Sequence, residues 1–267
     1  MLQETKLQDM HVPQVEAELL ETVHRIAGGG AWRVAWSTSS ARKGYAGVAT
    51  IWCEERLGVR AINCFPLEVD PSHEAGLEGR TLLLDLPLPS NICKSSSIGL
   101  VNVYTPNAGA SLERLEYRTG VWGWDERFRL AVADVIQTRQ GRAIVGGDLN
   151  VAVEDVDFFN PNEKRMEKQA GTTPEERESM RGLLRPSGCF AGFSDAFRVI
   201  HPAARGQYTY WSQRAGNRAW NRGLRLDYFL VSRQVEGCVA DVEHLRSLGG
   251  SDHCPVKLVL DLEKLRD

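Results

Sequence analysis

The chain has 267 residues, of which 42% are hydrophobic and 25% charged, and its formal net charge is −3. This composition is typical of a globular protein with a sizeable core and excludes a mainly disordered chain. No apolar run approaches the roughly 18 residues of a membrane span, so we expect neither a span nor a membrane partner. The six cysteines show no C-x-x-C pairing, which favours reduced thiols in an intracellular compartment.

The first part of the chain contains one predicted helix and several predicted strands. The helix covers 13–27, because Pro13 suits a first helical turn and three glycines follow Ala27. The strands are rich in β-branched residues or alternate between polar and apolar side chains. They cover 32–37, 46–53, 58–64, 80–86 and 98–104.

The second part adds two helices and four strands. One helix covers 124–140, and another opens with Thr173 as N-cap and Pro174 in its first turn. The strands cover 143–146, 207–211, 226–231 and 255–262. Many strands with few helices between them indicate two sheets packed face to face with helices outside, an α/β sandwich in a single domain over 1–267.

A carboxylate and an amide follow the strand 143–146. Asp148 and Asn150 are two residues apart, so at a strand end their side chains point the same way, and the two preceding glycines permit an unusual turn. The carboxylate could activate a water and the amide could donate to a phosphate oxygen. An ordinary turn after a strand is the alternative.

A histidine and a carboxylate near the C-terminus suggest a second pair. Asp227 falls inside an apolar strand, where an unpaired carboxylate would be costly, and His253 needs a partner to fix its tautomer. We therefore expect an Asp227–His253 pair. The alternative is a surface turn at His253 with Asp227 capping a loop.

Arginines and aromatic residues alternate in the segment 196–226, which contains no acidic residue. Phosphate backbones attract such arginines, and aromatic rings can stack on unpaired bases. The alternative is a basic solvated loop whose aromatic residues belong to the core. The residues concerned are Arg198, Arg205, Tyr208, Tyr210, Trp211, Arg214, Arg218, Trp220, Arg222 and Arg225.

Seven short runs, in this order, resemble the exonuclease III-type apurinic/apyrimidinic endonucleases of the endonuclease/exonuclease/phosphatase superfamily. They are LQETK at 2–6, YTPNAG at 104–109, LEYR at 115–118 with WDERF at 124–128, GGDLNVA at 146–152, YTYW at 208–211, RLDYFL at 225–230 and GSDHCP at 250–255. The resemblance covers nearly the whole chain. It implies a DNase I-like fold: a four-layered α/β sandwich of two mostly antiparallel sheets flanked by helices.

The resemblance also implies residue roles. It implies a site for Mg²⁺, with Mn²⁺ as an alternative, formed by Glu4, Asp148, Asn150, Asp252 and His253. It implies catalytic roles for Tyr104, Asn107, Asp148, Asn150, Asp227 and His253. It implies DNA contacts from Tyr45, Arg114, Tyr210, Arg214, Trp220 and Leu226.

The chain departs from the family pattern at four places. One is Arg214, which stands where some relatives have an apolar residue that wedges into the DNA. Ala110 stands where many relatives have an arginine that enters the DNA, and Leu224 replaces a tryptophan near the pocket. Relatives also have an earlier strand that ends in Trp-Asn-x-x-Gly, and no run of this chain matches it. We therefore expect an N-terminally truncated member whose first strand is absent.

The resemblance implies a monomeric base-excision repair enzyme that cleaves double-stranded DNA 5′ to an abasic site, with 3′-phosphodiesterase or exonuclease activity as an addition. It implies an intracellular protein of the nucleus, with the mitochondrion as an alternative. Two other interpretations stay open. One is a DNA-binding or scaffold member with impaired catalysis, and the other is a phosphoesterase of the superfamily that acts on a lipid or phosphoinositide.

Overall fold

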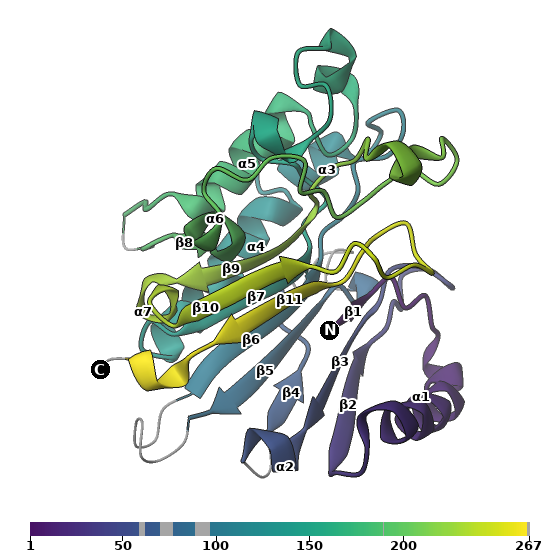
Figure 1. Ribbon diagram of the computed structural model, residues 1–267, viewed down its shortest axis with the longest axis vertical. Helices are drawn as coiled ribbons and strands as arrows, with labels where there is room; N and C mark the ends of the chain where they lie inside the picture. The colour runs from purple at the N-terminus through teal and green to yellow at the C-terminus, as the bar shows by residue number, and fades with distance from the viewer. Residues whose placement is uncertain (59–61, 70–76, 89–96, 189, 266–267) are drawn as a thin grey trace. The chain divides into compact units, whose positions relative to one another are not determined.

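The computed structural model describes residues 1–58, 62–69, 77–88, 97–188 and 190–265 (Figure 1). The chain forms two compact units. The first comprises the described residues of Met1–Tyr104 and Asp134–Gly147, and the second those of Thr105–Ala133 and Asp148–Arg266. A single domain over 1–267 stays a prediction. Within the described ranges, no helix is both long enough and apolar enough to cross a membrane.

The first unit contains two groups of paired strands. One has the order β1-β3-β2, all antiparallel, with β1 at Leu2–Gln3, β2 at Trp32–Ser37 and β3 at Val48–Cys53. The other has the order β4-β5-β6-β7, with β4 at Asn63–Phe65, β5 at Thr81–Pro87, β6 at Ser97–Tyr104 and β7 at Ala143–Asp148. Helix α1 (Val12–Ala27) lies along β2, and α2 (Glu54–Leu57) follows β3 (Figure 1).

The second unit contains two antiparallel strand pairs and most of the short helices. The pairs are β8 (Phe193–Asp195) with β9 (Asp227–Ser232), and β10 (Val239–His244) with β11 (Val256–Leu260). The helices are α3 (Leu115–Thr119), α4 (Trp124–Thr138), α5 (Pro174–Leu184), α6 (Ala196–Ile200) and α7 (Arg233–Glu236). The boundary between the units falls within the sequence of α4 and at the last residue of β7. Short 3₁₀ helices cover Asp9–His11, Asp155–Asp157, Lys164–Lys168, Asn217–Trp220 and Leu262–Lys264.

Local sequence explains the ends of the helices. Helix α1 begins with Pro13 in its first turn and ends at Gly28, whose φ of 82° is in the region that favours glycine. Helix α5 has the predicted N-cap: the Thr173 side chain accepts from the backbone N–H of Glu176, whose own side chain completes a capping box. These features and the start of α4 at Trp124 confirm the three predicted helix starts.

Most predicted strands are present, but one is wrong. The segment 207–211 forms no strand, because the backbone of Tyr210 pairs only through isolated bridges to Leu224 and His253. Three residues of the strand predicted at 58–64 lie outside the described residues, and β4 covers Asn63–Phe65. Strands β1, β8 and β10 were not predicted, and α4 ends at Thr138 rather than at residue 140.

Candidate active site

Asp148 is the last residue of strand β7 and lies at the start of a tightly constrained turn. Gly147 has a φ of 142°, and a Cβ there would lie 2.0 Å from the carbonyl oxygen of Val103, so only glycine fits. The Asp148 side chain is buried, and its Oδ1 accepts the backbone N–H of Asn150 at 2.8 Å. Asn150 itself has a left-handed backbone, with φ at 49°. The turn therefore fixes the carboxylate through its own backbone.

Asn150 connects this turn to the segment that follows β6. Its Nδ2 donates to the carbonyl oxygen of Thr105 at 2.8 Å, and its Oδ1 accepts from Nδ2 of Asn107 at 2.9 Å. The backbone N–H of Thr105 donates to the carbonyl oxygen of Asp148 at 2.9 Å. The two asparagines predicted to hold the water or the phosphate are thus hydrogen-bonded to each other through their side chains.

The predicted pair between Asp227 and His253 is present. His253 Nδ1 lies 2.8 Å from Asp227 Oδ2, and the two side chains are 28% and 13% exposed. Burial lowers the pKa of His253, but the charge and hydrogen bond of Asp227 outweigh it, and the net effect raises this pKa to about 10. Asp148 and Asp252 act in the same direction. The imidazole is therefore protonated at neutral pH.

Three predicted residues converge on one place in the second unit. Ligand atoms of Asp148, Asp227 and His253 all lie within 4.8 Å of one another. The ring of Tyr210 lies beside them, its centroid 5.0 Å from that of His253. Burial raises the pKa of Tyr210, and the negative charges of Asp252 and Asp148 add to the effect. This cluster is an acidic group that could hold a metal ion, and Asp252 is not a member of it.

A buried arginine supports the turns that carry these residues. Arg118 is 2% exposed, and it donates to the carbonyl oxygens of Leu149 at 2.6 Å, Asn150 at 2.8 Å and Pro106 at 3.2 Å. Its charge is balanced by Glu176, with Nη1 to Oε1 at 3.0 Å, and by Asp125. One guanidinium thus connects both loops of the site.

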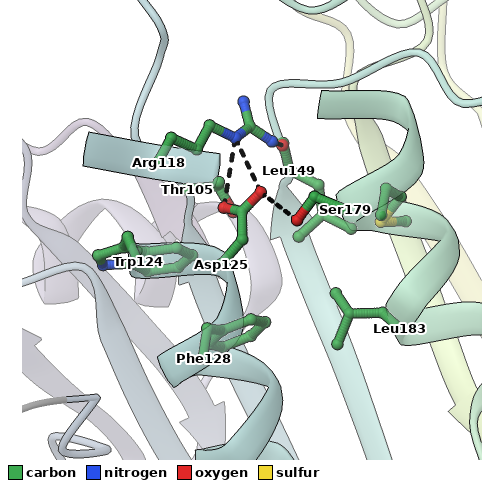
Figure 2. Close-up of a pocket in the computed structure, with 9 residues that line it drawn as sticks. Thr105, Arg118, Trp124, Asp125, Phe128, Leu149, Ser179 and Leu183 are labelled. Carbon is green, nitrogen blue, oxygen red and sulfur yellow. Dashed lines mark hydrogen bonds and ion pairs between the residues drawn. The ribbon is translucent and has the colours of Figure 1, made fainter. Parts of the chain in front are cut away.

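Figure 2 shows the contact between Arg118 and Asp125. Asp125 also accepts a hydrogen bond from the hydroxyl of Ser179 at 2.8 Å. The adjoining cavity has a volume of about 10 Å³, which is room for about one water. Nine residues line it: Thr105, Arg118, Trp124, Asp125, Phe128, Leu149, Ser179, Met180 and Leu183. Sequence reasoning did not assign Arg118 a role, although its position in the run LEYR of the family pattern was the available signal.

Two of the predicted site residues lie together in the first unit. The hydroxyl of Tyr104 donates to Oε1 of Glu4, and Lys6 forms an ion pair with Oε2 of the same carboxylate at 2.9 Å. Glu4 has a left-handed backbone with φ at 54°. Tyr104 is buried, and the guanidinium of Arg80 lies 4.9 Å from the centre of its ring. The Glu4 carboxylate is thus held between a hydroxyl and an ammonium group.

The predicted DNA-contacting residues have different environments. Trp220 is 73% exposed, and Arg214 is exposed in the segment that precedes it. The guanidinium of Arg114 lies 4.6 Å from the ring centre of Tyr117. Leu226 is buried in a cluster with Ala152, Phe158 and Met166, against which Tyr210 and Leu224 pack. Tyr45 is half-buried in the first unit, where its hydroxyl accepts from Arg80 at 2.8 Å.

The arginine-rich segment is only partly a surface, and neither of the two interpretations left open from the sequence describes all of it. Arg225 is buried and binds Asp157 through two hydrogen bonds, at 2.9 and 3.0 Å, and Asp195 at 2.7 Å. Arg198 forms an ion pair with the same Asp157. A buried guanidinium group needs such partners, so Arg225 belongs to the core, whereas Arg198 is half-buried. The rings of Tyr208 and Trp211 are buried as well.

Comparisons with known proteins agree with this geometry. The sequence profile of the endonuclease/exonuclease/phosphatase family matches residues 1–253. An exodeoxyribonuclease of Bacillus subtilis is 33% identical over 261 residues, which are 98% of this chain and 87% of that protein. The DNA repair nuclease APEX1 of Danio rerio is 34% identical over 260 residues, 97% of this chain and 72% of that protein.

A solved structure is similar as well. The AP endonuclease LMAP of Leishmania major superimposes with a TM-score of 0.78 at 30% identity, and the match covers 97% of this chain and 77% of that one. This similarity confirms the predicted α/β fold class of sheets flanked by helices. The chain belongs to the endonuclease/exonuclease/phosphatase family.

Proposed function

We propose that the protein is a base-excision repair nuclease that hydrolyses the DNA phosphodiester 5′ to an abasic site, with additional activity at 3′ ends. The observation that carries the proposal is the convergence of Asp148, Asp227 and His253 within 4.8 Å. The names of its relatives support the substrate: an exodeoxyribonuclease, a DNA repair nuclease and an AP endonuclease. No relative compared above is named for a lipid substrate.

The chemistry of the donor groups supports a hard divalent cation. Carboxylate oxygens are the ligands that Mg²⁺ and Mn²⁺ prefer, and Asp148 and Asp227 supply them at one place. We propose Asp148, Asn150 and Asp252 of the second unit as ligands, and the role of Glu4, in the first unit, stays a prediction. A bound cation would supply Lewis-acid stabilisation of the negative charge on the phosphate.

His253 is proposed to contact the phosphate, and its role as a metal ligand stays a prediction. The Asp227 carboxylate raises the pKa of His253 to about 10, so without a bound cation the imidazole is protonated at neutral pH. Since Nδ1 is bonded to Asp227, Nε2 is the nitrogen that remains to donate to a phosphate oxygen. We therefore propose that His253 binds the scissile phosphate as a protonated imidazole. Asp227 is proposed to orient the imidazole ring and to favour its protonated form.

Asp148 is the group proposed to take the proton from the attacking water. Its Oδ1 accepts the N–H of Asn150, and this hydrogen bond orients the carboxylate that is proposed to act as the base. The amide of Asn107, hydrogen-bonded to Asn150, is proposed to hold the water or a phosphate oxygen, and the catalytic role of Tyr104, whose hydroxyl donates to Glu4 in the first unit, stays a prediction. Each role uses a group whose position is fixed by a hydrogen bond.

The exposed residues Arg214 and Trp220 are proposed to bind the DNA around the lesion, together with Arg114 and Tyr45. An abasic nucleotide leaves the base stack at little cost, so a small pocket can select it. Tyr210, beside His253, and Leu226 are proposed as walls of that pocket.

The test is incision of an abasic duplex oligonucleotide with Mg²⁺, with Mn²⁺ and with EDTA. We expect cleavage 5′ to the lesion with either metal and none with EDTA. An undamaged duplex of the same sequence is the control, and 3′-blocked ends measure the additional activity. Binding of the abasic duplex without metal-dependent incision would contradict the proposal and identify a DNA-binding scaffold instead.

We also propose that the protein acts as a monomer inside the cell, in the nucleus first and in the mitochondrion as the alternative. Four cysteines, Cys53, Cys64, Cys238 and Cys254, are free thiols, which is compatible with a reducing compartment. Light scattering in solution tests the oligomeric state. Fractionation of cells that produce the protein tests its location.

A further inference from the structure

We propose that Thr209 is a positioning residue for the reaction, and that its hydroxyl holds Asp227 in the orientation that His253 requires. The inference rests on the proposed function, because it assigns a role within that site. The Thr209 hydroxyl binds backbone N–H groups, so Thr209 acts through the residues that it holds.

The hydroxyl of Thr209 binds the backbone where β9 begins. Its Oγ1 accepts the N–H of Leu226 at 2.9 Å and the N–H of Asp227 at 3.1 Å. Thr209 is fully buried, with 0% exposure, so water cannot replace this oxygen. A hydroxyl oxygen has two lone pairs, and here both serve consecutive peptide groups. The orientation of the Asp227 backbone therefore depends on one side-chain atom.

The backbone of Thr209 binds the other side of the ion pair. Its carbonyl oxygen accepts the N–H of Cys254 at 2.7 Å, one residue after His253. The next residue, Tyr210, forms an isolated bridge with His253 and places its ring beside the imidazole. Thr209 is thus hydrogen-bonded to the backbone of Asp227 and to that of the residue directly after His253. It therefore binds both segments that carry the 2.8 Å contact between Asp227 and His253.

The peptide group of Leu226 is also hydrogen-bonded to the residue that follows Asp148, the proposed catalytic carboxylate. The carbonyl oxygen of Leu226, whose N–H the hydroxyl binds, accepts the N–H of Leu149 at 2.8 Å. Leu149 directly follows Asp148 in the sequence. A shift of the peptide groups at 226 and 227 would therefore move Asp227 relative to both His253 and Asp148.

Removing the hydroxyl leaves two buried N–H groups without an acceptor, and the backbone must move to satisfy them. Valine has nearly the same shape as threonine but lacks the acceptor, whereas serine keeps it. Because partners that orient a catalytic group typically contribute about tenfold to a hundredfold to activity, we expect an effect of that size on kcat.

The experiment measures kcat and KM for abasic-site incision in Thr209→Val, Thr209→Ser and a matched control, Thr172→Val. Thr172 is also buried, but its hydroxyl donates only to the carbonyl oxygens of Met166 and Gln169. We expect Thr209→Val to lower kcat about tenfold to a hundredfold with little change in KM. Thr209→Ser should recover most of this loss, and Thr172→Val should keep the wild-type kcat.

A double-mutant comparison separates positioning from general stability. If Thr209 acts through Asp227, then adding Thr209→Val to Asp227→Asn lowers kcat no further. An equal loss of kcat in both backgrounds, a wild-type kcat in Thr209→Val, or no recovery in Thr209→Ser would overturn the inference. If the valine variant does not fold, Thr209→Ala takes its place in every comparison. Absence of incision by the wild type would instead refute the proposed function.

Discussion

Asp227 Oδ2 lies 2.8 Å from Nδ1 of His253, and this contact raises the pKa of the imidazole to about 10. The folded-state pKa is above the ordinary value of 6.5, so the pair stabilises the fold fully below pH 6.5. The stabilisation is lost as the pH rises from 6.5 towards 10. We expect the difference in unfolding free energy between the wild type and Asp227→Asn to shrink across this range. Urea unfolding in EDTA at several pH values measures it, and a difference that does not change with pH would contradict the assignment.

Replacing Asp148 by asparagine should abolish most of the activity and leave the fold intact. The substitution keeps the shape of the side chain and an oxygen that can accept from the Asn150 N–H, but removes the base. We expect kcat for abasic-site incision to fall by about three orders of magnitude. Asp155→Asn is the matched control, because Asp155 is exposed and pairs only with Arg177. Incision by Asp148→Asn at the wild-type rate would remove Asp148 from the mechanism.

The Asp227–His253 pair was predictable from the sequence because each residue had a local reason to need a partner. Asp227 lies in an apolar strand, where an unpaired carboxylate would be costly, and His253 needs a partner to fix its tautomer. The Asp148–Asn150 turn was predictable for a similar reason, since two glycines precede it. Short-range sequence patterns of this kind indicate that a side chain needs a polar partner or that the backbone forms a turn.

Other features depend on contacts between distant segments, which no local pattern encodes. Arg225 looks like a DNA contact in the sequence, but its partners Asp157 and Asp195 are far from it in the chain and bury it. The segment 207–211 alternates like a strand, yet the backbone of Tyr210 forms only isolated bridges, with the distant residues Leu224 and His253. The role of Arg118 depends on carbonyl groups of two separate loops, and carbonyl groups have no sequence signature.

Replacing Arg118 by lysine should weaken both stability and activity. Lysine keeps the positive charge near Glu176 and Asp125, but its three donors do not have the planar geometry that reaches three carbonyl oxygens and two carboxylates. We expect the unfolding free energy to fall by about 3 kcal/mol, because buried polar groups lose their partners. Urea unfolding measures this loss. Arg185→Lys, at an exposed ion pair with Glu178, is the control and should change stability by less than about 0.5 kcal/mol.

Trp220 should contribute to DNA affinity without contributing to stability. Its ring is 73% exposed at the end of a 3₁₀ helix, so its removal exposes no core. We expect Trp220→Ala to weaken abasic-duplex binding by about 1–3 kcal/mol, the usual contribution of a stacked ring. The control is Trp122→Ala, whose ring is 60% exposed in the loop between α3 and α4. Fluorescence anisotropy measures both, and equal affinities for the two variants would refute a specific role of Trp220.

His244, at the end of β10, should make the fold sensitive to acid. Burial lowers its pKa to about 3, and the charges of Arg225, Arg246 and Arg198 add to the effect. The folded state therefore holds a neutral imidazole, which stacks on Phe197 with ring centroids 4.3 Å apart. Since the unfolded chain binds a proton near pH 6.5, the stability present above this pH is lost progressively as the pH falls towards 3.

The test is His244→Phe, which keeps a flat ring against Phe197 and removes the titrating group. We expect the variant to lose less unfolding free energy than the wild type between about pH 7 and pH 4, because one proton-linked contribution is absent. Asp157 also titrates with an altered pKa, lowered by Arg225 and Arg198 against the effect of burial, so both proteins should still lose stability in acid. The unfolding free energy of each protein has a slope against pH, and the difference between the two slopes gives the contribution of His244. Identical slopes would show that this imidazole does not remain neutral in the fold.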